Sequence, residues 1–192
     1  MNSNLFILIL AAAVILLPLL YVLALYNSLV SLRNYIRESW SDVDTELQRR
    51  YDLIPNLVAT VKGYAAHERE VLERVTELRN RCAANNGPVA DQSRDEVQLV
   101  DALKQLLVVV DNYPQLKADQ NFLQLQKELV NTEDRIQAAR RFYNGNVRDY
   151  RNKCETFPSN LVANMFGFKS EGDFFSVPPS VRDVPNVDFA TS

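Results

Sequence analysis

The 192-residue chain is poor in the residues that build most metal and cofactor sites. It has one histidine, His67, and two cysteines, Cys82 and Cys154, which lie 72 positions apart. Zinc sites take three or four protein ligands, usually histidine or cysteine at short spacing. A di-iron helical bundle takes Glu-x-x-His from two helices. The sequence cannot supply either set, so we predict no metal and no cofactor.

Motifs for nucleophilic catalysis and phosphate binding are also missing. The chain contains neither G-x-S-x-G nor G-x-x-x-x-G-K. His67 and Cys82 are expected on one helix, more than about 20 Å apart, which excludes a Cys–His pair between them. The formal charge is only −3, and no run of Lys or Arg dominates, so nucleic-acid binding is not supported. We predict no catalytic residue and a non-enzymatic protein.

Glycine and proline are scarce as well, with 5 and 8 residues, which favours long regular elements. A long apolar run, LFILILAAAVILLPLLYVLAL, occupies residues 5–25 and carries no charged residue. Its 21 residues span about 31 Å as a helix, close to the hydrocarbon thickness of a bilayer. A cleaved signal peptide would need a basic start, and residues 1–4 contain no Lys or Arg. We predict a transmembrane helix over 5–26, with Leu5, Phe6, Leu25 and Tyr26 in the membrane.

The flanking charges predict the orientation of this helix. Its N-terminal side has no basic residue, whereas Arg33 and Arg37 follow its C-terminal end. Cytoplasmic flanks are enriched in Lys and Arg, so we expect the N-terminus outside and the remainder in the cytoplasm. The expected domains are a short tail over 1–4, the span over 5–26, a helical domain over 27–156 and a C-terminal tail over 157–192.

Residues 27–156 read as four helices. Apolar residues recur every three or four positions from 29 to 54, including Trp40, from 57 to 82 and from 116 to 154. A further helix over 95–112 is apolar over much of its circumference, which predicts a well-buried position. The residues 85–93, NNGPVADQS, predict a loop. Short connections make neighbouring helices antiparallel. The predicted fold is all-α: a transmembrane helix that continues into an up-down-up-down four-helix bundle, followed by a mostly irregular tail.

Two prolines set the expected helix boundaries. Pro55 and Pro114 each follow an aspartate by three positions, Asp52 and Asp111. Aspartate can cap a helix, and proline is tolerated in its first turn, so we predict helices starting at both places. The alternative is two long helices, each kinked at a proline. In the first case Arg50 and Asn56 are exposed at a tip of the bundle and are candidates for contacting another subunit or partner.

Three charged residues occupy core-facing positions in the helical pattern: Glu68, Glu133 and Arg140. Buried charges are costly unless they are paired. Either the three side chains reach the edge of the bundle, or they form a buried ionic layer that fixes the register of the helices.

The tail begins with FPSNLVANMFGF, residues 157–168, whose apolar residues lie largely on one helical face. Phe157 and Phe166 are candidates for membrane contact. Two interpretations remain open: a short helix at the membrane interface, or a segment that closes the open end of the bundle. The proline-rich residues that follow are expected to be extended or disordered.

Three stretches resemble the LemA family. They are YNSLVSLRNYIRESWSDVDTELQRRYDLIPNLVATVKGYAAHE at 26–68, YPQLKADQNFLQLQKEL at 113–129 and AARRFYNGNVRDYRNKCETFPSNLVANMFGFK at 138–169. The resemblance implies a bacterial protein with one N-terminal transmembrane helix, an external N-terminus and a cytoplasmic antiparallel bundle. It implies no established enzymatic activity. A relative among the magnetosome membrane proteins points toward membrane organisation or shaping.

These observations lead to a functional hypothesis. The chain is expected to be a bacterial inner-membrane scaffold whose partners are the lipid bilayer and further copies of itself. The alternative is an accessory protein that presents its bundle to another membrane protein, such as a protease or a sensor. An enzyme is the third interpretation, and we find no convergent polar residues that would line a substrate pocket.

Overall fold

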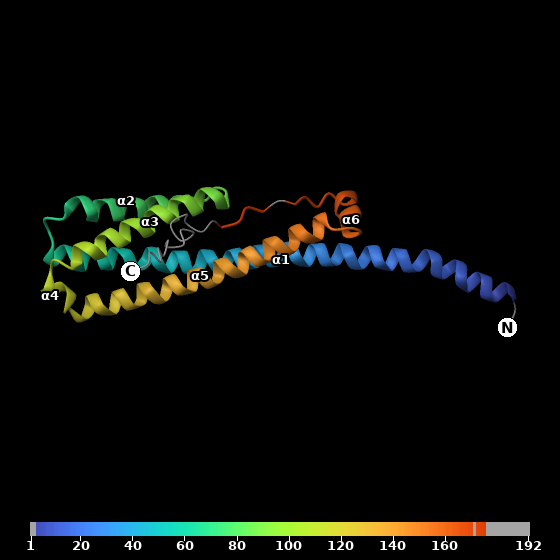
Figure 1. Cartoon of the computed structure of the whole chain (residues 1–192), viewed down its shortest axis with the longest axis horizontal. Coiled ribbons are helices and arrows are strands. Elements are labelled where there is room, and N and C mark those ends of the chain that lie inside the picture. Colours follow the sequence, from blue (N-terminus) through green and yellow to red (C-terminus); the bar gives the residue numbers. More distant parts are fainter. Residues whose placement is uncertain (1–2, 171, 176–192) are drawn as a thin grey trace, which may run out of the picture. The chain divides into compact units, whose positions relative to one another are not determined.

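The computed structural model describes residues 3–170 and 172–175, and within them the chain is helical with no strand. This confirms the predicted all-α class. The helices, labelled in Figure 1, are α1 (Ser3–Tyr64), α2 (Arg69–Ala84), α3 (Val89–Val110), α4 (Pro114–Lys117), α5 (Gln120–Glu155) and α6 (Ser159–Met165). The expected proline-rich end of the tail lies outside the described residues.

Helix α1 passes through Pro55 without a break, so the predicted helix start at this proline is wrong. The turn comes ten residues later, at residues 65–68. Asp52 does not cap a helix either, because it lies inside α1 and accepts a hydrogen bond from Gln48 Nε2 at 2.9 Å. The apolar pattern from 57 to 82 is therefore shared between the end of α1 and α2.

Arg79 explains how α1 tolerates this proline. Pro55 has no N–H, so the carbonyl of Tyr51, four residues earlier, lacks its usual helical donor. Arg79 of α2 donates from Nε to this carbonyl oxygen at 3.0 Å. Pro55 therefore does not end α1. It leaves the Tyr51 carbonyl oxygen free to accept a hydrogen bond from α2.

Pro114 does begin a helix, as predicted, but this helix is the four-residue α4, and the long fourth helix of the bundle begins at Gln120 instead. The expected cap is also wrong. Tyr113 precedes α4, and Asp111 instead follows the last residue of α3. The aspartate that caps a long helix is Asp119, whose Oδ1 accepts the backbone N–H of Phe122 at 2.9 Å in the first turn of α5.

The chain divides into two compact units. The bundle unit comprises Asp44–Ala138 and the residues from Asp173 onward, and the stem unit comprises Met1–Val43 and Ala139–Gly172. Helices α1 and α5 contribute to both units. In the bundle unit α1, α2, α3 and α5 alternate in direction through short turns, which confirms the predicted up-down-up-down order (Figure 1).

The core of the bundle unit is formed by the apolar faces of these four segments. Each segment buries residues spaced three or four positions apart, as the sequence pattern predicts. The most deeply buried include Leu47, Ile54, Leu57, Val61, Val75, Leu78, Leu99, Leu106, Phe122 and Ile136.

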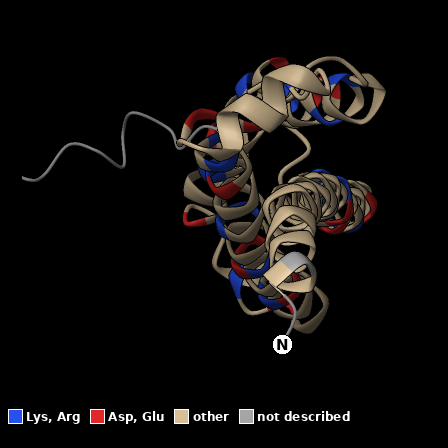
Figure 2. Cartoon of the chain, turned by 90° about the vertical axis from the view of Figure 1, so that its right-hand side faces the viewer, with Lys and Arg blue, Asp and Glu red and all other residues tan. Residues whose placement is uncertain are grey.

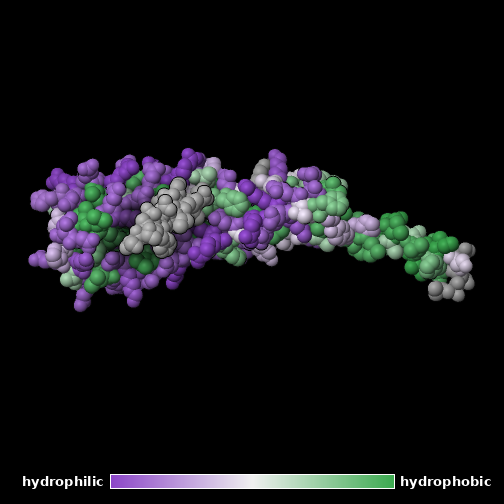
Figure 3. Space-filling view, in the orientation of Figure 1, coloured by the Kyte–Doolittle hydropathy of each residue, from purple (hydrophilic) through white to green (hydrophobic). Residues whose placement is uncertain are grey.

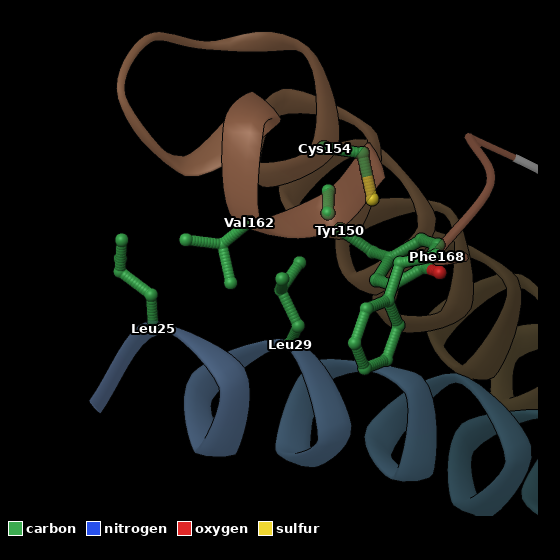
Figure 4. Close-up of a cluster of buried hydrophobic side chains, with 7 residues drawn as sticks. Leu25, Leu29, Tyr150, Cys154, Val162 and Phe168 are labelled. Atoms are coloured by element: carbon green, nitrogen blue, oxygen red, sulfur yellow. The ribbon is translucent and has the colours of Figure 1, made fainter. Parts of the chain in front are cut away.

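The stem unit has its own core where α6 packs on α1 and α5. Its buried residues are Leu25, Leu29, Tyr150, Cys154, Val162, Ala163 and Phe168, most of them labelled in Figure 4. Leu25 was expected to face lipid, but Val162 points toward it from α6 in Figure 4, and the leucine is buried within the protein.

Candidate functional site

A buried ionic centre joins three helices of the bundle unit. Arg50 of α1 is 1% exposed and forms an ion pair with Glu96 of α3, which is 4% exposed. Arg50 Nη1 also donates to Oε2 of Glu133 on α5 at 2.8 Å. The hydroxyl of Tyr51 donates to Glu96 from the next position of α1. We call Arg50, Tyr51, Glu96 and Glu133 the ionic centre.

The electrostatics of the ionic centre favour a structural role over a catalytic one. One guanidinium serves two carboxylates, and the Glu133 side chain keeps 33% of its surface exposed, so part of the excess negative charge stays hydrated. Removing one member of a buried pair leaves an uncompensated charge in an apolar core. The ionic centre can therefore fix the register of α1 against α3 and α5, because a shifted helix would leave Arg50 buried without a carboxylate.

The ionic centre corrects one prediction and bears on one interpretation that the sequence left open. Arg50 was expected to be exposed at the tip of the bundle, and that is wrong because it is buried. Glu68, Glu133 and Arg140 were candidates for one ionic layer, but Glu68 accepts a hydrogen bond from Tyr113 Oη at 3.1 Å, while Glu133 binds Arg50. Arg140 is buried and belongs to the stem unit.

The thiols are held in their protonated form. Burial raises the pKa of Cys82 to about 11, and the nearby Arg50 cation opposes this shift only in part. Burial also raises the pKa of Cys154, and that of the Tyr51 hydroxyl in the ionic centre. A thiol with a raised pKa is a poor nucleophile at neutral pH.

His67 lies in the exposed turn between α1 and α2, and not on a helix as expected. Within residues 3–170 and 172–175, no group of three or more His, Cys, Asp or Glu side chains is arranged to hold a metal ion.

The second candidate site is the apolar surface of the stem unit. Helix α1 is long and apolar enough to cross a membrane, and its most apolar stretch is not buried by the protein. The predicted membrane residues Leu5 and Phe6 are exposed, as are their large apolar neighbours up to Leu20. Figure 3 shows this stretch as a continuous hydrophobic surface, and Figure 2 shows no charged residue on the turns next to the N-terminus.

Helix α6 lies beside α1 where the apolar stretch ends. Tyr26 contacts both aromatic rings that follow α6, with ring centroids 4.9 Å from Phe166 and 5.6 Å from Phe168. The guanidinium of Arg33 lies 5.3 Å from the centre of the Phe168 ring, a cation–π arrangement. These contacts hold the segment after α6 against α1.

The sequence pattern placed the apolar residues of 157–168 largely on one helical face. In the structure they divide between buried and exposed positions. Val162 and Phe168 are buried against the stem core, which agrees with a segment that closes the end of the helices. Phe157, Leu161, Met165 and Phe166 are exposed, with Phe157 at 74% and Met165 at 65%. Part of the segment therefore serves the core, and the rest presents a bare apolar surface.

The remaining predicted site residues, Trp40 and Asn56, both lie on α1. Trp40 is half-buried in the stem unit and meets Tyr143 edge to face, with ring centroids 5.3 Å apart. Asn56 is exposed on α1, as predicted, and its backbone carbonyl accepts a hydrogen bond from Thr60 Oγ1 at 2.9 Å.

Sequence reasoning missed Glu96 and Arg79. Glu96 stands in the run DEVQLV, where its spacing of three from Leu99 matches a core-facing position. That spacing was the available signal for a buried acid. Arg79 had no such signal, because its role depends on a carbonyl that Pro55 frees on another helix.

Comparison with known proteins identifies the family that this chain matches. The family model described as the LemA family matches residues 39–189 of this chain. Protein LemA of Metamycoplasma hominis is 27% identical over 168 residues, which cover 86% of this chain and 74% of that protein.

Two magnetosome proteins are also similar. Magnetosome protein MamQ 2 of Paramagnetospirillum magneticum is 24% identical over 180 residues, covering 81% of this chain and 66% of its own length. Magnetosome protein MamQ of Magnetospirillum gryphiswaldense is 23% identical over 178 residues, covering 80% and 65%. The chain thus spans just under two thirds of the length of these MamQ proteins.

Proposed function

This chain belongs to the LemA family, and we propose that it is a membrane-anchored, non-enzymatic scaffold that self-associates at the bacterial inner membrane and organises or shapes it. The observation that carries this proposal is α1, which has an exposed apolar stretch at one end and continues without a break into the bundle unit. The magnetosome proteins among its relatives make membrane organisation the first property to test.

The exposed stretch supports a lipid environment on energetic grounds. Leu5–Leu10 and Val14–Leu17 expose more than half of their surface. Keeping one such side chain in water costs roughly 1.5–3 kcal/mol relative to an apolar environment. A row of them along one helix would drive aggregation in water, whereas the hydrocarbon of a bilayer would solvate all of them.

The orientation can be tested by cysteine labelling. Arg33 and Arg37 are both exposed beyond the apolar stretch, which favours a cytoplasmic bundle. In a Cys82→Ala, Cys154→Ala background, Ser3→Cys should react with an impermeant maleimide on intact spheroplasts, and Gln124→Cys should react only after lysis. The reverse pattern would contradict the orientation.

Self-association is supported by exposed apolar residues on α5 of the bundle unit. Leu123 and Val130 are 47% and 56% exposed, and their spacing of seven places them on one side of the helix. A membrane anchor confines copies to two dimensions, where a weak contact acts at a high effective concentration. Contacts too weak to persist in solution can therefore organise the protein on the bilayer.

Particle mass in lipid nanodiscs or mild detergent tests the scaffold. We expect particles of several times the 21.9 kDa chain mass, and a shift toward the monomer for Leu123→Glu with Val130→Glu. The matched control is Gln124→Glu with Asn131→Glu, which adds the same charge at exposed positions of the same turns. A strict monomer at membrane densities would refute self-association, and one stoichiometric partner in a pull-down would favour the accessory role instead.

A further inference from the structure

The bare side of α6 has a defined position relative to the apolar stretch of α1. Val162 and Ala163 of α6 pack in the same core as Leu25 and Leu29 of α1. The apolar stretch ends at residue 25, so α6 is held within about one turn of its end. All of these residues belong to the stem unit, where their contacts are direct.

This position corresponds to a depth in the bilayer. Residues 5–25 span about 31 Å as a helix, which matches the hydrocarbon thickness. If α1 spans the membrane, residue 25 lies at the hydrocarbon boundary, and α6 lies in the interfacial layer next to it. The exposed apolar residues of this segment are Phe157, Leu161, Met165 and Phe166.

A hollow beside α6 extends about one helical turn further into the apolar stretch of α1, from Leu25 to Tyr21. It has a volume of about 430 Å³, and Tyr21 and Leu25 of α1 line it together with Phe157. Lys153 and Asp149 of α5 line it too. The hollow therefore joins an apolar wall on the hydrocarbon side to charged groups at the height of the lipid head groups.

The residues around α6 include aromatic and basic side chains, which are the types that favour the membrane interface. Aromatic rings favour the interface between hydrocarbon and water, and Tyr26, Phe166 and Phe168 form a cluster there. Basic side chains attract the lipid phosphates. Arg33 lies over Phe168, and the exposed Lys169 directly follows this phenylalanine.

From these observations we infer that residues 157–166 form an interfacial foot, with Phe157, Leu161, Met165 and Phe166 seated among the lipids of one leaflet beside α1. The occupant of the bare surface is the lipid leaflet at the C-terminal end of the apolar stretch. The inference rests on the proposed membrane anchor. The foot adds a second membrane attachment, in one leaflet only. This attachment would fix the rotation of α1 about its own axis, and the inserted side chains would spread the lipids of that leaflet.

Tryptophan quenching by brominated phospholipids tests the foot in the full-length protein. Trp40 is the only tryptophan, so Trp40→Phe provides a silent background. Phe157→Trp and Met165→Trp should each lose at least about twofold in fluorescence with lipids brominated in the upper acyl chain. Tyr35→Trp is the matched control, because Tyr35 is also an exposed aromatic of the stem unit but lies ten residues beyond Leu25. It should remain unquenched.

A fourth position separates failure of the foot from failure of the anchor. Leu16→Trp lies in the middle of the apolar stretch and should be quenched by lipids brominated deep in the acyl chains. Quenching at 16 without quenching at 157 or 165 would overturn the foot and leave the anchor intact. No quenching at any position would overturn the anchor and the foot together.

A variant then tests whether the exposed apolar side chains cause the insertion. Leu161→Gln with Met165→Gln, in the Phe157→Trp background, should abolish quenching at 157 while the helix content by circular dichroism is unchanged, because both side chains are exposed. Asn164→Gln changes another exposed residue of α6 and should keep the quenching. Unchanged quenching in the double variant would contradict the inference.

Discussion

Arg50 and Glu133 lie 83 residues apart in the sequence, and Nη1 of the arginine donates to Oε2 of the glutamate at 2.8 Å. The same guanidinium pairs with Glu96, so one cation connects α1 with α3 and α5. The arginine is buried while one of its two acids remains partly hydrated. Because of this asymmetry, loss of the arginine should destabilise the folded protein more than loss of Glu133.

Arg50→Met should destabilise the protein by about 3–5 kcal/mol, because it leaves Glu96 charged in the core without its cation. Urea unfolding followed by circular dichroism in detergent measures the change. Adding Glu96→Gln should recover part of the loss, since the stranded charge is then gone.

Arg49→Met is the matched control for this prediction. Arg49 is the preceding residue, has a side chain that is 46% exposed, and pairs with Glu46 one turn away at 3.2 Å. A surface pair of this kind contributes less than about 1 kcal/mol. Equal losses for the two arginines would contradict the structural role of the ionic centre.

Pro55 and Arg79 should be energetically coupled. Pro55→Ala restores the N–H that can bind the Tyr51 carbonyl, so this carbonyl no longer needs Arg79 as its donor. Arg79→Met should therefore cost about 1 kcal/mol more in the unchanged chain than in the Pro55→Ala background. A double-mutant cycle of urea midpoints measures the difference, and additive effects would show that the arginine does not compensate for the proline.

The stability of the bundle unit should fall as the pH rises above 9. The pKa of Cys82 is about 11 in the folded protein, because of burial, and 9.0 in its ordinary state. The unfolded chain therefore loses this proton first, so the contribution of the protonated thiol is complete below pH 9 and disappears as the pH approaches 11.

Removing the thiol tests this pH dependence. Cys82→Ala should show a smaller fall in its urea midpoint between about pH 8.5 and 10.5 than the unchanged protein, because no buried thiol then resists ionisation. Cys154→Ala controls for the other thiol. Parallel curves for Cys82→Ala and the unchanged protein would contradict this assignment.

Asp119 should stabilise α5 most strongly while it is ionised. The N–H of Phe122 and the hydroxyl of Tyr64, which lies 3.0 Å from Oδ2, hold the pKa of Asp119 below its ordinary value of 3.8. A lowered pKa means that the contribution of the carboxylate charge is present above about pH 4 and is lost as the pH falls through the folded pKa.

Two substitutions check this role of Asp119. Asp119→Ala should lower the melting temperature at pH 7, and Asp119→Asn should lower it less because asparagine also caps helices. Asp111→Ala serves as the control, since the Asp111 carboxylate pairs with the exposed Lys117 at 2.8 Å and does not cap α4. An equal effect of the two alanine substitutions would argue against capping by Asp119.

The sequence by itself determined the helical class and the apolar stretch, because both depend on local order. A spacing of three or four between apolar residues, as from Leu47 to Ile54, specifies one buried face whatever lies opposite. Twenty-one residues without a charge fit a bilayer by length alone.

Tertiary structure decided what depends on a partner distant in sequence. Pro55 and Pro114 stand in the same local pattern, yet only Pro114 starts a helix, because Arg79 supplies a donor where Pro55 removes one. Arg50 resembles its exposed neighbour Arg49 until α3 and α5 bring two carboxylates to it. Val162 and Leu161 are adjacent and both apolar, but only the valine meets the stem core. In each case a neighbour from another helix determines burial or pairing, and spacing along one helix does not contain that information.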